Sequence, residues 1–339
     1  MEIKEALSEI IKGRDLQRED MSSVMFEILE GRSTDAQIGA FLVALNIKGE
    51  SVDEVVGAVS VMRELSKKVE VGIHHLVDTC GTGGTGVGIF NVSTASAFIA
   101  CAGGAKVAKH GNRSVTSTCG SADLLEQAGL PLDLGPKEVS RCIEEVGVGF
   151  MFAPAHHSAM KHAVGPRKEM GIKTIFNILG PLTNPAGAPN QIIGVYDKKW
   201  VRPIAEVLKE LGSRHVLVVH SKDQLDEISI ASETYVAELI NGSIKEYVIE
   251  PEDFGFSKHS LDDLIVTSAS ESLSIIKQGF LDKNYAASSM IAMNAGAALY
   301  ASGVTSSLKE GVEAATNCVK SGEGLEKLDE LIIFSQSLV

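Results

Sequence analysis

Residues 76–94 read LVDTCGTGGTGVGIFNVST, a sequence in which glycines separate a strand-like segment from a segment of small residues. Leu76 and Val77 end an apolar run typical of a buried strand, and Asn91 opens a segment of small residues, 91–103, with helical character. The glycines between them allow the backbone to turn sharply from strand to helix. The stretch therefore predicts the start of a βα unit, with a glycine-rich loop at the carboxyl end of its strand.

Short apolar runs recur on the carboxyl side of this unit, separated by helical or loop segments. We expect strands at 105–109, 146–152, 191–196 and 215–220. Alternation of strand and helix at this spacing predicts an α/β layer with a mostly parallel sheet. A later segment, 235–250, alternates apolar and polar residues around Asn241-Gly242, which is typical of a β-hairpin.

The first 70 residues have a different pattern, that of a run of short amphipathic helices. Ser51 and Glu54 have the spacing of a capping box and predict the start of one of these helices. We therefore expect an α/β protein with two domains. The first is a small all-α domain, residues 1–70, with a contribution from about 165–188, and the second is a larger α/β domain, 71–339, with a central, mostly parallel sheet.

Composition and charge exclude several classes of function. The net charge of −13 disfavours binding to nucleic acid, which requires a cationic surface. No stretch approaches 18 unbroken apolar residues, and the first helix mixes charged residues into its apolar positions, so we expect neither a membrane span nor a secretory signal. Five scattered cysteines without a C-x-x-C pair suit a reducing cytoplasm.

The glycine-rich loop itself, residues 81–88, is a candidate anion site. Glycines let the backbone approach a phosphate closely, and the helix start that follows presents free N–H groups with a favourable dipole. A structural strand-to-helix turn would use the same glycines. The loop lacks the Gly-Lys-Ser/Thr ending of a Walker motif, and no acidic residue stands at the position expected for a dinucleotide fingerprint.

A second cradle follows the second predicted strand. Residues 109–117 read KHGNRSVTS and residues 120–123 read GSAD. Lys109 and Arg113 provide two cations among glycines and hydroxyls, and Lys suits a pyrophosphate as a point charge. An ordinary solvated surface is the alternative interpretation.

Two further clusters carry titratable groups. Asp226 and Glu227 follow a predicted strand, and adjacent carboxylates on a loop suit Mg²⁺, although such a pair is more often a solvated turn. His156 and His157 lack a third ligand at helical spacing, so a structural or substrate-lining role is favoured over zinc. Arg167 could clamp a carboxylate or cap the segment that crosses between the domains.

Taken together, these segments resemble anthranilate phosphoribosyltransferases over nearly the whole chain. The motifs appear in the order and spacing of that family: GTGG…NVST (81–94), KHGNRS (109–114), GSAD (120–123), FAPAHH (152–157), GPRKEMG (165–171), FNILGPLTNP (176–185), LDEIS (225–229), PEDFG (251–255) and NAGAALY (294–300). The resemblance implies the fold shared by nucleoside phosphorylases and phosphoribosyltransferases, and a homodimer formed through the helical domain. It also implies transfer of the phosphoribosyl group of phosphoribosyl pyrophosphate (PRPP) to the amine of anthranilate in tryptophan biosynthesis, with Mg²⁺ as cofactor.

The resemblance also implies roles for individual residues. The expected PRPP site comprises Gly81, Gly84, Thr85, Ile89, Asn91, Ser93, Thr94, Lys109, Ser117 and Ser121. The expected anthranilate site comprises Gly81, His110, Asn112, Arg167 and Pro181. Ser93, Asp226 and Glu227 would be the metal ligands.

Two positions depart from the family pattern. The family usually has Asp where this chain has Thr85, and commonly a small hydroxyl residue where it has Ile89. Both lie on the PRPP loop, so we expect them to affect the catalytic rate and the choice of phosphoribosyl donor more than the fold.

Two alternative functions remain open, a pyrimidine-nucleoside phosphorylase-like enzyme and a non-catalytic nucleotide-binding homologue. The chain lacks the KHSTGG run typical of the phosphorylases.

Overall fold

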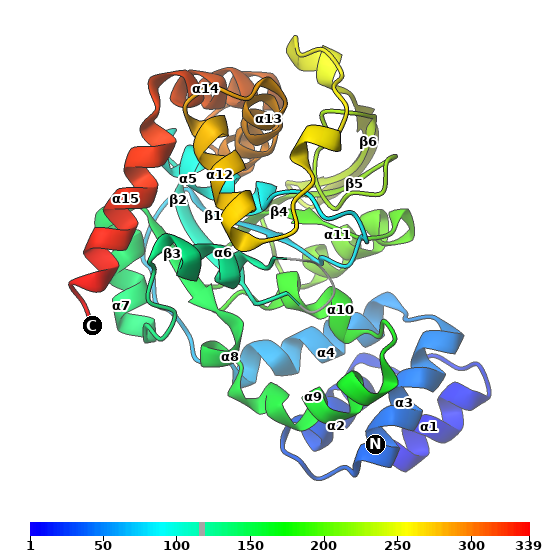
Figure 1. Cartoon of the computed structure of the whole chain (residues 1–339). Coiled ribbons are helices and arrows are strands. Elements are labelled where there is room, and N and C mark those ends of the chain that lie inside the picture. The colour runs from blue at the N-terminus through cyan, green and yellow to red at the C-terminus, as the bar shows by residue number, and fades with distance from the viewer. Residues whose placement is uncertain (115–118) are drawn as a thin grey trace.

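A single seven-stranded sheet organises the larger part of the chain. The structure is a computed structural model that describes residues 1–114 and 119–339. The sheet has the order β3-β2-β1-β4-β5-β6-β7 (Figure 1). Neighbouring strands from β3 to β5 are parallel, and β5, β6 and β7 are antiparallel. The strands are β1 Leu76–Gly81, β2 Lys106–Gly111, β3 Val148–Phe152, β4 Asn190–Gly194, β5 His215–Ser221, β6 Thr234–Ile240 and β7 Ser243–Ile249.

These strands confirm the expected α/β class with a mostly parallel sheet. Their ends differ from the predicted ones by one or two residues, the usual uncertainty of strand and helix ends. The predicted hairpin forms between β6 and β7, where Ile240 pairs with Ser243 across a two-residue turn. Asn241 and Gly242 both have positive φ, 51° and 73°, as a type I′ turn requires.

The chain leaves β1 in one direction to form β2 and β3 and then returns to place β4 on the other side of β1. The carboxyl ends of β1 and β4 therefore flank a topological switch point, where open α/β sheets form ligand crevices.

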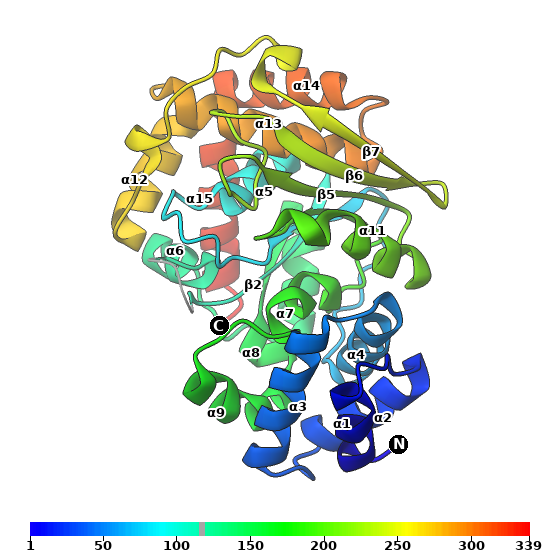
Figure 2. The same ribbon diagram turned by 90° about the vertical axis from the view of Figure 1, so that its right-hand side faces the viewer.

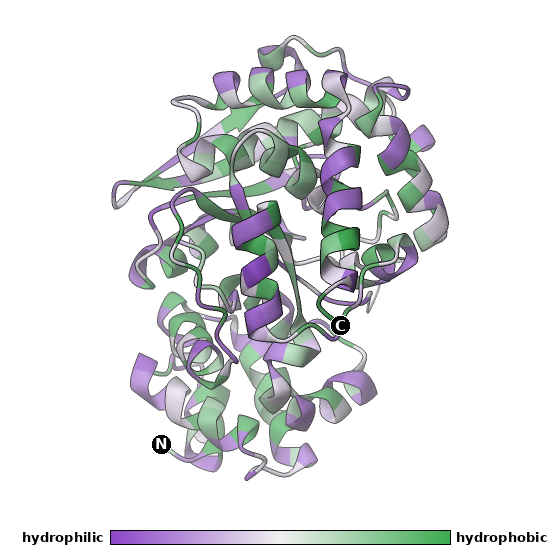
Figure 3. Cartoon of the chain, turned by 90° about the vertical axis from the view of Figure 1, so that its left-hand side faces the viewer, coloured by the Kyte–Doolittle hydropathy of each residue, from purple (hydrophilic) through white to green (hydrophobic). Residues whose placement is uncertain are grey.

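Helices cover both faces of the sheet. On one face α5 packs against β1 and β2 and α13 against β1, β4 and β5, and on the other face α11 packs against β5 and β6. Figure 2 shows α13 and α11 on opposite sides of β5 and β6. Figure 3 shows helices with both hydrophobic and hydrophilic turns, as expected where only one face is buried. The helices of this part are α5 Val92–Ala102, α6 Ser121–Ala128, α7 Pro136–Arg141, α8 Ala153–His156, α10 Phe176–Leu179, α11 Val201–Glu210, α12 Ala269–Phe280, α13 Tyr285–Ser302, α14 Leu308–Ser321 and α15 Glu323–Gln336.

The first 70 residues form four helices, α1 Ile3–Ile11, α2 Arg18–Leu29, α3 Asp35–Lys48 and α4 Val52–Leu65. The capping box at the start of α4 is present, because Ser51 Oγ accepts from Glu54 N and Glu54 Oε2 accepts from Ser51 N. A later helix, α9 Lys161–Met170, packs against α2 and α3. The segment 165–188 thus contains the end of α9, the whole of α10 and a 3-10 turn at Gly180–Thr183. Within the described residues, none of the helices combines the length and the hydropathy needed to cross a membrane.

Helices α13 and α14 approach each other closely in the α/β part. A Cβ atom at Gly296 of α13 would lie 2.5 Å from both Cα and N of Val312 in α14. Because both atoms belong to the backbone, a side chain there would force the helices apart.

We therefore expect Gly296→Ala to lower the free energy of unfolding by about 1–3 kcal/mol, the usual cost of overpacking a core. Chemical denaturation measures the difference. Gly39→Ala in α3 is the matched control, since its Cβ would meet Met170 Sδ at 3.8 Å, an ordinary contact. The control should be neutral or slightly stabilising, because Ala favours a helix over Gly. Equal effects of the two substitutions would contradict this packing.

Candidate active site

A cavity of about 290 Å³ lies at the carboxyl ends of β1 and β2, beside the switch point. Most of the residues expected at the site line it. They are Gly81, Gly84, Thr85, Ile89, Asn91, Ser93, Lys109, His110, Asn112, Ser121, Arg167, Pro181, Asp226 and Glu227. Segments separated by more than a hundred residues therefore meet at one place. Ser117 lies outside the described residues.

Thr94 does not line the cavity. It is 1% exposed, and its hydroxyl donates to Asn91 Oδ1 at 2.7 Å. The Asn91 amide in turn donates to Cys119 O at 3.1 Å. Thr94 therefore lies behind Asn91 and orients its side chain, and the expected direct contact of Thr94 with a ligand is not supported.

The glycine loop after β1 is shaped by contact with the acidic pair. Gly83 and Gly84 have φ of 64° and 75°, which favour glycine. Gly83 N donates to Asp226 Oδ2 at 2.7 Å. A Cβ at Gly81 would lie 2.5 Å from that same oxygen, so a larger residue there would displace the carboxylate.

The two departures from the family pattern have local partners. The Thr85 hydroxyl lies 3.4 Å from both N and O of Val87, within the same loop. Ile89 forms an isolated antiparallel bridge with Ile265.

Lys173 donates to Gly84 O at 2.7 Å and lies over the ring of Tyr196. Nothing in the sequence pattern pointed to Lys173, which comes from the segment between α9 and α10.

The start of α5, the end of β2 and the acidic pair converge at Ser93. Lys109 Nζ lies 3.4 Å from Ser93 Oγ and also donates to Thr79 O. Ser93 N donates to Glu227 Oε1 at 3.1 Å. Lys109 is only 3% exposed, and it has no carboxylate partner within 4.0 Å among the described residues. Its ammonium group is thus available to an anion in the cavity.

Asp226 and Glu227 are carboxylates without a cationic side chain within ion-pair distance among the residues the structure describes. Burial raises the pKa of Asp226, and the hydrogen bond from Gly83 only partly offsets it. Burial also raises the pKa of Glu227 well above its usual value, and the charge of Asp226 adds to this. A bound cation would relieve both effects.

The donor set fits Mg²⁺. Two carboxylates and the Ser93 hydroxyl are hard oxygen donors, and Mg²⁺ typically takes one or two carboxylates and completes its shell with water and substrate phosphates. Among the described residues no group of three His, Cys, Asp or Glu side chains could enclose a metal by itself.

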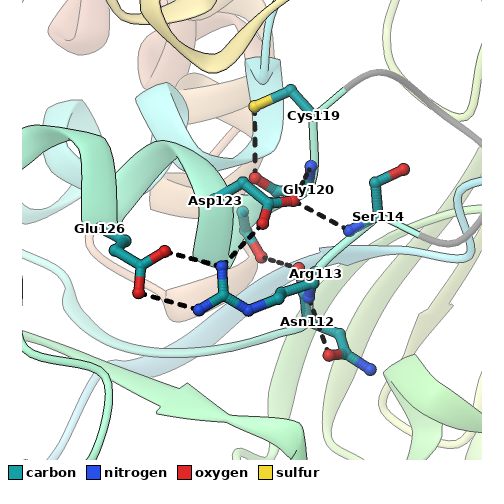
Figure 4. A network of polar contacts seen from close by, with 8 residues as sticks. Asn112, Arg113, Ser114, Cys119, Gly120, Asp123 and Glu126 are labelled. Atoms are coloured by element: carbon teal, nitrogen blue, oxygen red, sulfur yellow. Dashed lines mark hydrogen bonds and ion pairs between the residues drawn. The ribbon is translucent and has the colours of Figure 1, made fainter.

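Arg113 does not provide the second free cation expected from the sequence. Its guanidinium is bound to Glu126 at 2.7 and 2.8 Å and to Asp123 at 3.0 Å (Figure 4). It also lies over the ring of Phe152. These partners, 10 and 13 residues further along the chain, neutralise it. Lys109 is therefore the cation of the second cradle that remains available.

His110 and Arg167 line the same cavity. His110 is 3% exposed, and its buried ring lies against the backbone of Gly180. Burial lowers its pKa well below the usual value, and His157, with its ring centroid 5.1 Å away, lowers it further. The Arg167 guanidinium lies over Phe176, without a carboxylate partner in the described part of the chain. A neutral imidazole and an unpaired guanidinium suit a ligand with a carboxylate.

Asp78 escaped the sequence analysis although it holds the site together. It is fully buried and accepts from His110 N at 3.1 Å and from Asn184 Nδ2 at 2.7 Å. The Asn184 amide also donates to Ala108 O at 2.8 Å. Burial raises the pKa of Asp78 to about 6, against the opposing charge of Lys109. Asp78 thereby links β1, β2 and the turn that carries Pro181.

Comparison with known proteins agrees with the resemblance. The helical bundle domain of a glycosyl transferase family matches residues 4–66, and the a/b domain of that family matches residues 73–325. The anthranilate phosphoribosyltransferase of Marinomonas sp. (strain MWYL1) is 56% identical, with 99% of this chain and 98% of that protein covered.

Solved structures agree as well. The crystal structure of anthranilate phosphoribosyltransferase from Thermus thermophilus matches with a TM-score of 0.92 at 38% identity, covering 98% of this chain and 99% of that one. Structures of the Saccharomyces cerevisiae enzyme, one in complex with PRPP and Mg and one with 4-fluoroanthranilate, match at 27% identity. Their TM-scores are 0.88 and 0.87, and each covers 99% of this chain and 98% of the other. The phosphorylase-like alternative is not favoured by these relatives.

The base of the second cradle depends on Asp123. Its Oδ2 accepts from Ser114 N at 3.0 Å and from Gly120 N at 2.9 Å, so one carboxylate joins the two ends of the loop (Figure 4). Burial acts to raise the pKa of Asp123, but these N–H groups and Arg113 lower it overall. Because its pKa is lowered by folding, its stabilising contribution is present above the unfolded value, about 3.9, and is lost as the pH falls through the folded value.

We expect Asp123→Ala to accelerate amide exchange at Ser114 and Gly120 at pH 7 by about 10-fold or more, since each lost hydrogen bond to a charged group contributes about 1.5–3 kcal/mol. Amide exchange followed by NMR measures this. Glu126→Ala is the control, because it loses only an exposed ion pair with Arg113. Similar exchange in both variants would contradict the role of Asp123.

Proposed function

The chain belongs to the anthranilate phosphoribosyltransferase family, and on that premise we propose that it transfers the phosphoribosyl group of PRPP to the amine of anthranilate. The products are phosphoribosyl-anthranilate and pyrophosphate, and the reaction is a step of tryptophan biosynthesis. The observation that carries this proposal is the convergence of Lys109, Ser93 and the acidic pair on one cavity, which is also lined by Arg167, a cation without a carboxylate partner among the described residues.

We assign the PRPP site to the glycine loop, the start of α5 and the second cradle. The backbone at Gly81 and Gly84 and the amino end of α5 would receive the phosphates, with Lys109 as the point charge. Thr85 and Ile89 occupy this loop without adding charge. The other assigned residues are Asn91, Ser93, Thr94, Ser117 and Ser121, with Thr94 acting through Asn91.

Mg²⁺ would be held by Ser93, Asp226 and Glu227 together with oxygen atoms of PRPP. When bound there it supplies positive charge that stabilises the departing pyrophosphate. The related yeast enzyme has been solved in complex with PRPP and Mg, which supports this assignment.

We assign anthranilate to the wall formed by Asn112, His110, Arg167 and Pro181, beside Gly81. The guanidinium of Arg167 would pair with the carboxylate of anthranilate. The lowered pKa of His110 makes it a weak base, so we assign it a hydrogen bond to the acceptor rather than removal of its proton. The related yeast enzyme has been solved with 4-fluoroanthranilate.

The reaction breaks the bond between C1 of the ribose and a pyrophosphate oxygen and forms one between C1 and the amine nitrogen. An aromatic amine is largely unprotonated at pH 7 and gives its proton to solvent afterwards, so the chain needs to supply no strong base. Its residues contribute by holding donor and acceptor in line and by stabilising the charge of the leaving group.

We propose further that the chain is a homodimer that joins through its helical domain, residues 1–70 with a contribution from about 165–188, leaving 71–339 as the catalytic domain. The resemblance to anthranilate phosphoribosyltransferases supports this, and Ile11 on α1 and Ile47 on α3, 72% and 83% exposed, are apolar side chains that such a contact could cover. All five cysteines are free thiols, which supports a cytoplasmic location.

The central experiment mixes the protein with anthranilate, PRPP and Mg²⁺ and follows the loss of anthranilate fluorescence. We expect turnover with the natural chain and none above background for Asp226→Asn combined with Glu227→Gln. The control is Glu233→Gln, which removes a partly exposed charge from the same loop. Near-normal activity of the double variant at limiting Mg²⁺ would refute the metal assignment, and no turnover by the natural chain would refute the function.

The acidic pair also predicts a dependence on pH. Because folding raises the pKa of both carboxylates, protons compete with the metal at low pH, and the Mg²⁺ concentration needed for half-maximal turnover should fall as the pH rises from 6 to 8. Thermal stabilisation by Mg²⁺ alone, measured over the same range, separates this effect from the titration of PRPP itself. A requirement independent of pH in both measurements would contradict the assignment.

Arg167 provides a test of the acceptor side. We expect Arg167→Ala to raise the KM for anthranilate about 10-fold or more, because a charge-assisted hydrogen bond contributes about 1.5–3 kcal/mol. The KM for PRPP should stay within about twofold, as expected for a group that does not touch the donor. The neighbouring Lys168→Ala, which alters the same helix outside the cavity, is the control. Equal effects on both substrates would remove Arg167 from the acceptor site.

A further inference from the structure

One polar residue lies in the middle of the otherwise apolar helix α13. Asn294 is 2% exposed and belongs to the NAGAALY motif, for which the proposed mechanism has no use. Its side-chain amide is fully hydrogen bonded. Oδ1 accepts from Ile228 N at 2.9 Å, and Nδ2 donates to Ile228 O and to Met290 O, both at 2.9 Å.

The two bonds to Ile228 are unusual because they engage both backbone polar groups of a single residue, as a neighbouring β-strand would. Ile228 directly follows Glu227 in the connection between β5 and β6, residues 222–233, which contains no helix or strand. Within the described residues, no other side chain from outside this connection hydrogen bonds to the backbone of 226–228. Asn294 therefore replaces the strand partner that this part of the connection lacks.

The backbone at Asp226, two residues before Ile228, also packs closely against the sheet. A Cβ at Gly194 of β4 would collide with the backbone oxygen of Asp226. Beneath Glu227 a cavity of about 10 Å³ is lined by Ser93, Ser96 and Asn294, which leaves room for one water molecule at most. The connection is thus held between the carboxyl end of β4 and the amide of Asn294.

We propose that Asn294 is a positioning residue that directs the carboxylates of Asp226 and Glu227 into the cavity. The inference rests on the proposed function, because it concerns the residues assigned to the metal. The helix α13 packs on β1, β4 and β5 (Figure 2), so the amide is attached to the same rigid layer as the strands that end at the site.

The chemistry of the contact requires an amide. Aspartate in this position would offer two acceptors and no donor. One of its negatively charged oxygens would then face the carbonyl oxygen of Ile228, which carries a partial negative charge. Leucine has a similar size but neither a donor nor an acceptor, and it would leave both backbone groups of Ile228 unpaired. Glutamine keeps both functions but places them one methylene further from the helix.

The test compares Asn294→Ala with Ser302→Ala. Ser302 lies in the same helix and is buried, but its hydroxyl bonds only to Leu299 O, away from the connection. The first measurement is amide exchange of residues 225–230 in the protein without added ligand. We expect at least about 10-fold faster exchange at Ile228 in Asn294→Ala and no change in Ser302→Ala.

The second measurement is the Mg²⁺ requirement. Residues that orient metal ligands typically change metal affinity 10- to 100-fold. We therefore expect Asn294→Ala to raise the Mg²⁺ concentration for half-maximal turnover about 10-fold or more, with the KM for anthranilate unchanged. The increase in Tm produced by Mg²⁺ with pyrophosphate should be reduced in Asn294→Ala and retained in Ser302→Ala. If Asn294→Ala does not fold, Asn294→Ser replaces it in all three measurements.

The outcomes separate the two claims. Absence of turnover and of any Tm increase in the natural chain would overturn the proposed function, and amide exchange would then decide the role of Asn294 alone. Normal exchange at Ile228 in the Asn294 variant would overturn the inference. If the natural chain is active, an unchanged Mg²⁺ concentration for half-maximal turnover in the Asn294 variant would also overturn the inference.

Discussion

Asp226 lies against the carboxyl ends of two strands, with its carboxylate beside Gly81 of β1 and its backbone beside Gly194 of β4, and neither contact leaves room for a side chain. Gly81 and Gly194 leave the space, and Gly83 N donates to the carboxylate. Through this contact a connection that leaves β5 meets the loop that leaves β1, although 143 residues separate Gly83 from Asp226. The strand order explains why the contact is possible. β4 returns to the side of β1 opposite β2, so the carboxyl ends of these three parallel strands lie at one edge of the sheet, where the connection after β5 meets the loop after β1.

The charges around this crevice are poorly compensated by the protein itself. Lys109, Asp226 and Glu227 are buried or half-buried, and burial raises the pKa of both carboxylates. A fold selected for stability alone would pair these groups or replace them, since buried charges without partners are costly. By contrast, Arg113 is fully paired with Asp123 and Glu126, and Glu54 with Lys48. Unpaired charge is thus concentrated where a magnesium-bound, highly charged substrate would supply the missing partners.

Sequence patterns predicted the features that local chemistry determines. The strands around 76–94, the capping box at Ser51 and the hairpin at Asn241-Gly242 all depend on residues within a few positions of one another. Three other contacts depend on residues that are distant in the sequence. These are the ion pairs of Arg113, the hydrogen bond between Asp78 and Asn184, and the hydrogen bonds between Asn294 and Ile228. They join residues 10, 106 and 66 positions apart, and a lone Asp or Asn in an apolar segment gives no sign of its partner. Family resemblance supplied the list of site residues, but it could not distinguish Thr94, which lies behind Asn91, from the residues that face the cavity.

The two departures from the family pattern alter charge rather than shape. Where relatives usually have an acid, Thr85 bonds within its own loop, and Ile89 pairs with Ile265 at the edge of the loop. Loss of an acid beside the glycine loop lowers the repulsion met by an incoming polyanion, and it also removes an oxygen that could order a water on the metal. The first effect would strengthen binding of PRPP, and the second would weaken stabilisation of the leaving pyrophosphate and so lower the rate of the chemical step. Lys173, which donates to Gly84 O, has no acid beside it at position 85; burial lowers its pKa, and the acids that act against this effect are Asp197 and Asp226. With a neutral residue at position 85, the proposed metal site would depend on Ser93, Asp226 and Glu227, and the hydrogen bonds between Asn294 and Ile228 would help to position the two carboxylates.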